Sequence, residues 1–116
     1  GNHIDFPNYG ADELVEIAAV MSRDLEYHLS PDALPVFKQY IQMRMNLPYF
    51  SNARTVRNAM DRARMNAAIR LYDTYAIQGV NGGNISPEEL MSINGQDFQV
   101  LVDDIVYADA SKRIFA

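Results

Sequence analysis

The chain has 116 residues, of which 48% are hydrophobic, so it can bury one core and is unlikely to hold two. It has no cysteine, which excludes disulfides and thiolate catalysis, and its formal net charge of −5 disfavours nucleic acid and anionic membranes as partners. His3 and His28 stand apart without ligand-like spacing, so we expect no metal site. Without a long apolar run or a signal-peptide pattern, a soluble protein is expected.

Residues 1–9 are too short and too interrupted by Pro7 to form a regular element, and we predict a hinge or linker. Residues 10–116 are predicted to form one domain. Its first helix should start at Ala11, with Gly10 or Asn8 near the N-cap and acidic residues in the first turns. The apolar positions of this helix recur at steps of three and four residues: Leu14, Ile17, Ala18, Met21 and Leu25.

Ser30-Pro31-Asp32 predicts the start of a second helix, with Ser30 as the cap and Pro31 at the first helical position. Its expected buried positions are Leu34, Phe37, Ile41 and Met45. Pro35 removes one backbone hydrogen bond near the helix start, and Pro48 should end the helix.

A long third helix should follow, capped by Ser51 or Asn52. Its predicted apolar seam is narrow and rich in alanine, which lets a neighbouring helix approach closely: Val56, Met60, Ala63, Ala67 and Leu71. Asp61 is spaced to pair with Arg57 and with Arg64 along the helix. Three further arginines have no such local partner: Arg54, Arg62 and Arg70.

Residues 78–84 are rich in glycine and predict a mobile loop. Ser86-Pro87 then predicts a short helix through Met91, which Asn94-Gly95 should break. From Asp97 onward the apolar spacing favours a helix, although Phe98, Val100 and Val102 also alternate as in a strand. The tail from Ala110 to Ala116 should pack back on the domain or meet another segment.

The predicted fold class is therefore all-α, a bundle of four to five helices with a long third helix. The sequence contains no glycine-rich phosphate loop, no Ser/His/Asp set and no recognisable acid–base pair. We accordingly expect no catalytic residue in the chain and no enzyme activity of its own.

Three segments carry a resemblance to a known family: FPNYGADELVEIAAVM, LSPDALPVFKQYI and PYFSNARTVRNAMDRARMNAAIRL. They resemble the C-terminal helical lid subdomain of AAA+ ATPases of the CbbX type, the red-type rubisco activases. The terminal RIFA is similar to the ending common in that family. The resemblance is continuous from about Asn2 to Leu71 and looser beyond.

The resemblance implies that the chain is the lid over a nucleotide, with the Walker motifs on an upstream α/β subdomain. The cofactor would be ATP, and that subdomain would hold the magnesium ion. Arg54, in Asn52-Ala53-Arg54, matches the sensor 2 arginine that contacts the phosphates, and Asn52 belongs to the same motif. Tyr9, next to the hinge, could lie against the adenine, or it could instead staple the start of the first helix.

The resemblance implies three kinds of partner: the α/β subdomain, neighbouring subunits of a ring, expected to be a hexamer, and a client protein, with inhibited red-type rubisco as the first candidate. The expected location is the cytoplasm, or the plastid stroma if the source is an alga. Two alternatives stay open: the lid of a related AAA+ protein of the type VII secretion or sporulation type, and a freestanding helical interaction module that never meets ATP.

Overall fold

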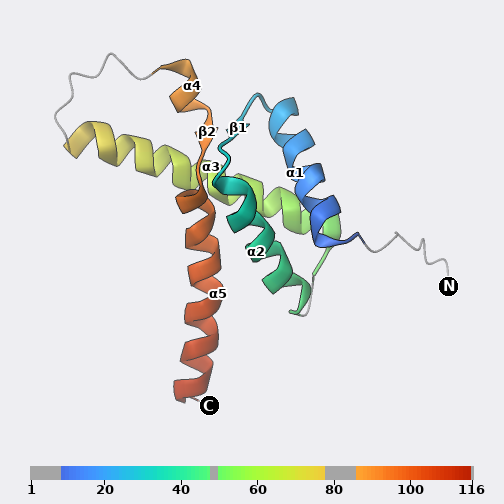
Figure 1. The fold of residues 1–116 in the computed structure, drawn as a ribbon. Helices are drawn as coiled ribbons and strands as arrows, with labels where there is room; N and C mark the ends of the chain where they lie inside the picture. The colour runs from blue at the N-terminus through green and yellow to red at the C-terminus, as the bar shows by residue number, and fades with distance from the viewer. Residues whose placement is uncertain (1–8, 48–49, 78–85, 116) are drawn as a thin grey trace.

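A computed structural model describes residues 9–47, 50–77 and 86–115, with the side chains of 75–77 and 111–115 left out. Five helices and two short strands occur in this part of the chain: α1 (Ala11–Asp24), β1 (His28–Leu29), α2 (Ala33–Met45), α3 (Asn52–Ile77), α4 (Pro87–Leu90), β2 (Ser92–Ile93) and α5 (Gly95–Phe115). In Figure 1, α3 lies across the molecule, α1 packs on it, α2 packs on α1 and α5, and α5 runs away from α3. The prediction of an all-α bundle with a long third helix is confirmed.

Helix α1 begins where its sequence predicts. Gly10 is the N-cap, and its amide donates to Glu13 Oε1 at 3.1 Å, one half of a capping box. Leu14 and Ala18 are fully buried, whereas Leu25 lies just past the end of the helix and is exposed. The predicted apolar face is thus right for the helix proper.

Helix α2 starts later than predicted. Asp32, not Ser30, is the N-cap, because the Ser30 amide donates to Ile93 O at 3.0 Å and the Ser30 hydroxyl donates to the Asp32 carboxylate. Phe37 and Ile41 are buried as expected. Leu34 and Met45 are exposed, so the predicted stripe is wrong at both ends. Ala33 and Tyr40 are buried in their place, and the helix ends at Met45, before Pro48.

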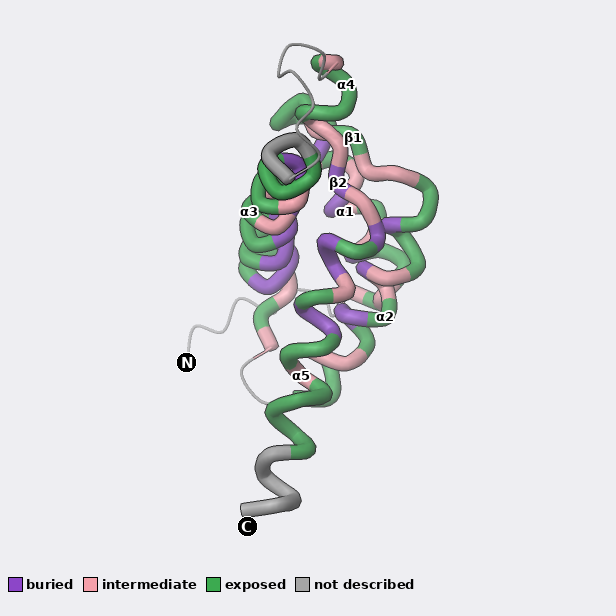
Figure 2. Tube along the Cα trace, turned by 90° about the vertical axis from the view of Figure 1, so that its left-hand side faces the viewer, coloured by how far each residue is buried: buried purple, intermediate pink, exposed green. Residues whose placement is uncertain are grey.

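The seam of α3 is confirmed at every position. Its five predicted residues are buried, together with Ala59: Val56, Met60, Ala63, Ala67 and Leu71. Figure 2 shows this buried line along the inner side of α3. Small side chains on one face let α1 and α5 both pack against the same long helix.

A two-stranded parallel sheet joins distant parts of the chain. His28 is in register with Ser92, and Leu29 with Ile93. The His28 amide donates to Met91 O at 2.8 Å. Segments of two residues are too short to show an alternating pattern, so this pairing could not be predicted from the sequence.

The start of α4 is predicted correctly, because Ser86 Oγ accepts the Glu89 amide at 3.1 Å. Helix α5 begins at Gly95 and runs through the predicted tail to Phe115. The alternative of a strand from Phe98 to Val102 is therefore wrong, and the preferred helix is confirmed. A Cβ on Gly95 would lie 2.8 Å from the Asp32 carbonyl oxygen, so glycine lets the starts of α2 and α5 meet. The hinge at 1–8, the glycine-rich loop and Pro48 lie outside the described residues.

Asp32 links these two helix starts and should make stability depend on pH. The hydrogen bond from Ser30, and then the Gly95 amide, hold the pKa of its exposed carboxyl below its ordinary value of 3.8. A folded-state pKa below the unfolded one stabilises the fold above the unfolded value, and this contribution disappears as pH falls through the folded value.

Asp32→Asn is therefore expected to lower stability at pH 7, with the difference from wild type shrinking below about pH 4. Urea unfolding between pH 7 and pH 3 measures this. Ser30→Ala should show the same trend, since it removes the main cause of the shift. A constant difference across that range would contradict the assignment.

Candidate functional site

The start of α3 is fixed to the core by a reciprocal pair of bonds. The Thr55 amide donates to Ser51 O at 2.7 Å, and the Ser51 amide donates to Thr55 Oγ1 at 3.1 Å. Thr55 and Val56 are buried, so the first turn is anchored from inside. The side chains that precede and follow them on the outer face are therefore presented on a rigid support.

Arg54 is the third residue of this helix, and its side chain is exposed. Within the described residues it forms no ion pair, and neither does the exposed Arg57 one turn later. The backbone amides of residues 52–54 donate no hydrogen bond to an acceptor among the described residues, as is usual for the first turn of a helix. Free amides, the positive end of the helix dipole and the Arg54 guanidinium thus favour an anion here, in a chain that is acidic overall.

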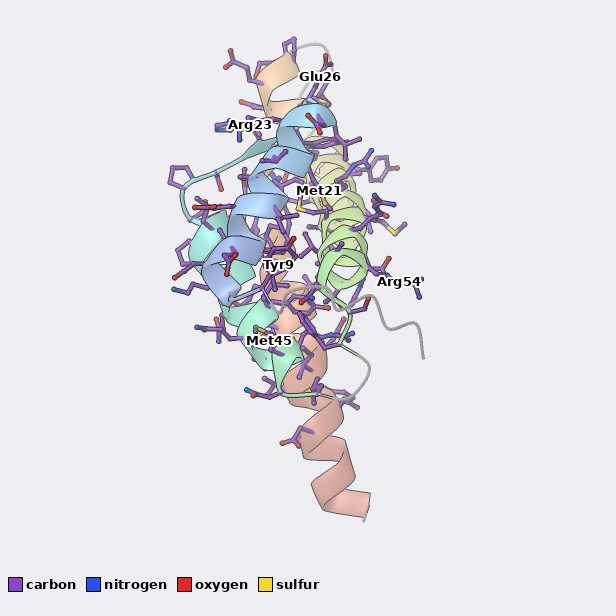
Figure 3. The ribbon with its side chains drawn as sticks, turned by 90° about the vertical axis from the view of Figure 1, so that its right-hand side faces the viewer. Tyr9, Met21, Arg23, Glu26, Met45 and Arg54 are labelled. Carbon is purple, nitrogen blue, oxygen red and sulfur yellow. The ribbon has the colours of Figure 1, made fainter. Side chains whose placement is uncertain are left out.

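Helices α1 and α3 begin at the same corner of the domain (Figure 1). Tyr9 precedes α1 by two residues, and Asn52 is the first residue of α3. Asn52 is half-buried. Tyr9 is half-buried against the core and lines a shallow hollow on α1 with Ile17, Val20 and Met21. Figure 3 shows Tyr9 close to the bundle, while Arg54 extends outward from α3. The structure therefore brings these residues to one corner without joining Tyr9 and Arg54 in one pocket.

The remaining arginines of α3 have partners. Arg64 pairs with Asp61 at 3.6 Å, as predicted, and its guanidinium lies 4.6 Å from the centre of the Tyr27 ring. The predicted Arg57–Asp61 pair does not form. Arg62 and Arg70, which lacked local partners in the sequence, both pair with aspartates of α5.

Arg70 makes the most buried ionic contact described. Its Nε and Nη2 donate to the two carboxylate oxygens of Asp97, each at 3.1 Å, and Nη2 also donates to Ser92 O at 3.2 Å. Asp97 in turn accepts the Asn94 amide at 2.8 Å at the start of α5. Sequence reasoning missed this cluster because its two charged residues are 27 positions apart.

Two further classes of site find no support in the described residues. No group of three or more histidine, aspartate or glutamate side chains there is placed to hold a metal ion. No helix in that part of the chain is long and apolar enough to cross a membrane. The start of α3 carries the described groups whose chemistry suits an anion, the first-turn amides and the Arg54 guanidinium.

The fold and the site together define a class of protein. It is a helical domain whose longest helix, α3, begins at a surface that favours an anion. The chain belongs to the AAA lid domain family, because the model of that family matches residues 10–106.

Curated relatives share this region. A protein from Guillardia theta named "Protein cbbX homolog, chloroplastic" is 58% identical over 106 residues, covering 91% of this chain and 28% of that protein. A "Ribulose bisphosphate carboxylase/oxygenase activase, chloroplastic" from Cyanidioschyzon merolae is 52% identical, covering 84% and 32%. "Protein CbbX" of Cereibacter sphaeroides is 48% identical over 71 residues, covering 61% and 23%. The chain thus spans a third or less of these relatives.

Proposed function

We propose that this chain is the nucleotide-sensing lid of an AAA+ ATPase similar to CbbX. The observation that carries the proposal is the exposed Arg54 at the anchored start of α3, in a chain of the AAA lid family. The intact protein would hydrolyse ATP and remodel a client. Inhibited rubisco is the first candidate, because one of the similar proteins carries the name of a rubisco activase.

Two groups of this chain would act on a phosphate. The first-turn amides of α3 donate hydrogen bonds to an anion, and the Arg54 guanidinium adds a bidentate, charge-assisted contact. Arg54 is long and exposed, so it reaches beyond the lid. ATP supplies a γ-phosphate that is lost on hydrolysis, and the magnesium ion would be held by an α/β subdomain. Because Arg54 contacts one nucleotide state more than the other, the lid orientation would follow the nucleotide state.

Asn52 and Tyr9 have supporting roles in this proposal. Asn52 precedes Arg54 by two residues and presents the first free amide of the turn. Tyr9 packs on the core and holds the start of α1, and the exposed part of its ring is the surface that would face an adenine. In this proposal the main role of Tyr9 is to anchor the start of α1 on the core.

The assembly and location follow from the same proposal. A lid that closes over a nucleotide would contact its own α/β subdomain and a neighbouring subunit of a ring, which we propose to be a hexamer. Two similar proteins are named as chloroplastic, and a third comes from a bacterium. We therefore propose the plastid stroma or the bacterial cytoplasm as the site of action.

Arg54→Ala in the full-length protein tests the proposal. Charge-assisted hydrogen bonds contribute about 1.5–3 kcal/mol, so ATP turnover or nucleotide affinity should fall by roughly ten- to a hundredfold. Steady-state hydrolysis and nucleotide titration measure the two quantities. Arg57→Ala removes an equal charge three residues away and should leave both nearly unchanged.

Arg54→Lys should fall between wild type and alanine, since it keeps the charge and loses the bidentate geometry. Hydrolysis and affinity that are the same in Arg54→Ala and wild type would overturn the sensor role. They would favour the alternative of a helical interaction module without a nucleotide.

A further inference from the structure

Helix α5 leaves the body of the domain along its own length. Its first half is packed, with Phe98, Leu101 and Val102 buried. Beyond Ile105 the described side chains are exposed, including Val106 at 55% and Tyr107 at 75%. Figure 1 shows this second half, residues 106–115, extending past the other helices. We refer to residues 106–115 as the α5 arm.

One row of α3 side chains holds α5. Arg62, Asn66 and Arg70 are spaced four residues apart and therefore lie along one side of the helix. Arg70 binds the Asp97 carboxylate, and Asn66 Nδ2 donates to Asp97 O at 2.9 Å. Arg62 Nη2 donates to Asp104 Oδ2 at 2.6 Å, nearly two turns further along α5. The row thus joins α3 both to the start of α5 and to the base of the arm.

The two ionic contacts of this row differ in their access to water. The side chains of Arg70 and Asp97 are 20% and 2% exposed, which makes this contact a fixed anchor. The side chains of Arg62 and Asp104 are 49% and 58% exposed, so water competes for this pair. Opening the outer contact would leave the anchor and the core intact.

A hollow next to the outer contact leaves room for the arm to move. Its lining includes Tyr40 and Leu47 from the α2 side, Arg62 of α3, and Ile105 and Ala108 of α5. Helix α5 packs on α2 nearer its start, where Phe98 meets Phe37, whereas this hollow lies at the base of the arm. The Arg62–Asp104 pair is an ionic contact between α3 and the base of the arm, beside this hollow.

We propose that Arg62 is a positioning residue, whose ion pair with Asp104 sets the direction of the α5 arm relative to α3. Arg54 lies eight residues before Arg62 on the same helix. Under the proposed function, on which this consequence rests, a pull on Arg54 by a nucleotide would reach the arm through the Arg62 contact. A change in the orientation of the lid would then move the arm, and the Arg62–Asp104 ion pair would transmit this movement from α3 to α5.

Distance measurement in this chain tests the pair directly. The chain has no cysteine, so Asn58→Cys on α3 and Tyr107→Cys on the arm accept two spin labels at exposed positions. Electron–electron double resonance then gives the distribution of distances between them. Wild type should give one narrow distribution. Arg62→Ala should raise the population outside it about two- to fivefold, the factor expected for an exposed ion pair.

Two controls separate the ion pair from side-chain packing. Arg57→Ala removes the same charge from α3 without touching α5 and should leave the distribution narrow. The exchange Arg62→Asp with Asp104→Arg should restore it. Raising the salt to about 1 M should broaden wild type and not Arg62→Ala, because screening weakens exposed pairs. A narrow distribution in Arg62→Ala, or no recovery in the exchange variant, would overturn the proposal.

The outcome is independent of the sensor proposal. Arg54→Ala should leave the label distances of this chain unchanged, because Arg54 makes no contact with α5 among the described residues. In the full-length protein, Arg62→Ala should keep the nucleotide affinity that Arg54→Ala loses. Equal losses in both variants would place Arg62 in the nucleotide site and overturn its positioning role.

Discussion

Arg70→Ala is expected to lower the free energy of unfolding by about 3–5 kcal/mol, because it leaves a buried charge without its partner. The Asp97 side chain is only 2% exposed and receives two hydrogen bonds from Arg70. Arg70 also satisfies Ser92 O at the end of the small sheet. One substitution would therefore disturb the junction of α3, β2 and α5 together. Urea unfolding followed by circular dichroism measures the loss.

Two comparisons make this result specific. Arg62→Ala removes an exposed arginine that lies two four-residue steps before Arg70 on the same row. It should lower the free energy of unfolding by less than about 1 kcal/mol. Arg70→Met combined with Asp97→Leu removes both charges and should recover much of the loss. If Arg70→Ala destabilises no more than Arg62→Ala, the buried pair does not hold the junction.

Phe98→Ala is the second large effect and should cost about 3–5 kcal/mol, through lost burial and the cavity left behind. Phe98 and Phe37 are both fully buried. Their rings meet edge to face with centroids 5.2 Å apart and an interplanar angle of 62°. This pair is the centre of the contact between α2 and α5, so its loss should loosen α5 from the domain.

A double-mutant cycle isolates the ring contact. Phe37→Leu, Phe98→Leu and the double variant keep much of the apolar volume and remove the aromatic geometry. The coupling should be about 0.5–1.5 kcal/mol. Additive losses would mean that the two rings contribute by burial alone. Val106→Ala on the exposed part of α5 is the matched control and should have little effect.

The parts of the fold that were predicted correctly depend on local chemistry. The seam of α3 repeats every three or four residues over four turns, and all its members are buried. Ser86 caps α4 because its hydroxyl and proline successor act within one turn. Such signals need only neighbouring residues.

The parts that were missed depend on residues far apart in the chain. Ser30 has the properties of a helix cap, but its hydroxyl donates to the Asp32 carboxylate, its amide pairs with Ile93, and α2 starts at Ala33. Arg70 appeared unpaired because Asp97 belongs to another helix. At the candidate site, the resemblance to the family indicated Arg54, and the structure places its side chain on the exposed face of α3. That Tyr9 and Arg54 line no common pocket could be seen only in the folded structure.

The short pairing of β1 with β2 determines when the chain can fold. Residues 28–29 and 92–93 enclose most of the sequence between them, so the pairing closes a large loop at a substantial entropic cost. The packing of Phe37 is likewise complete only when Phe98 of α5 is in contact with it. During synthesis, α2 and α3 therefore emerge before α5, the helix on which both pack.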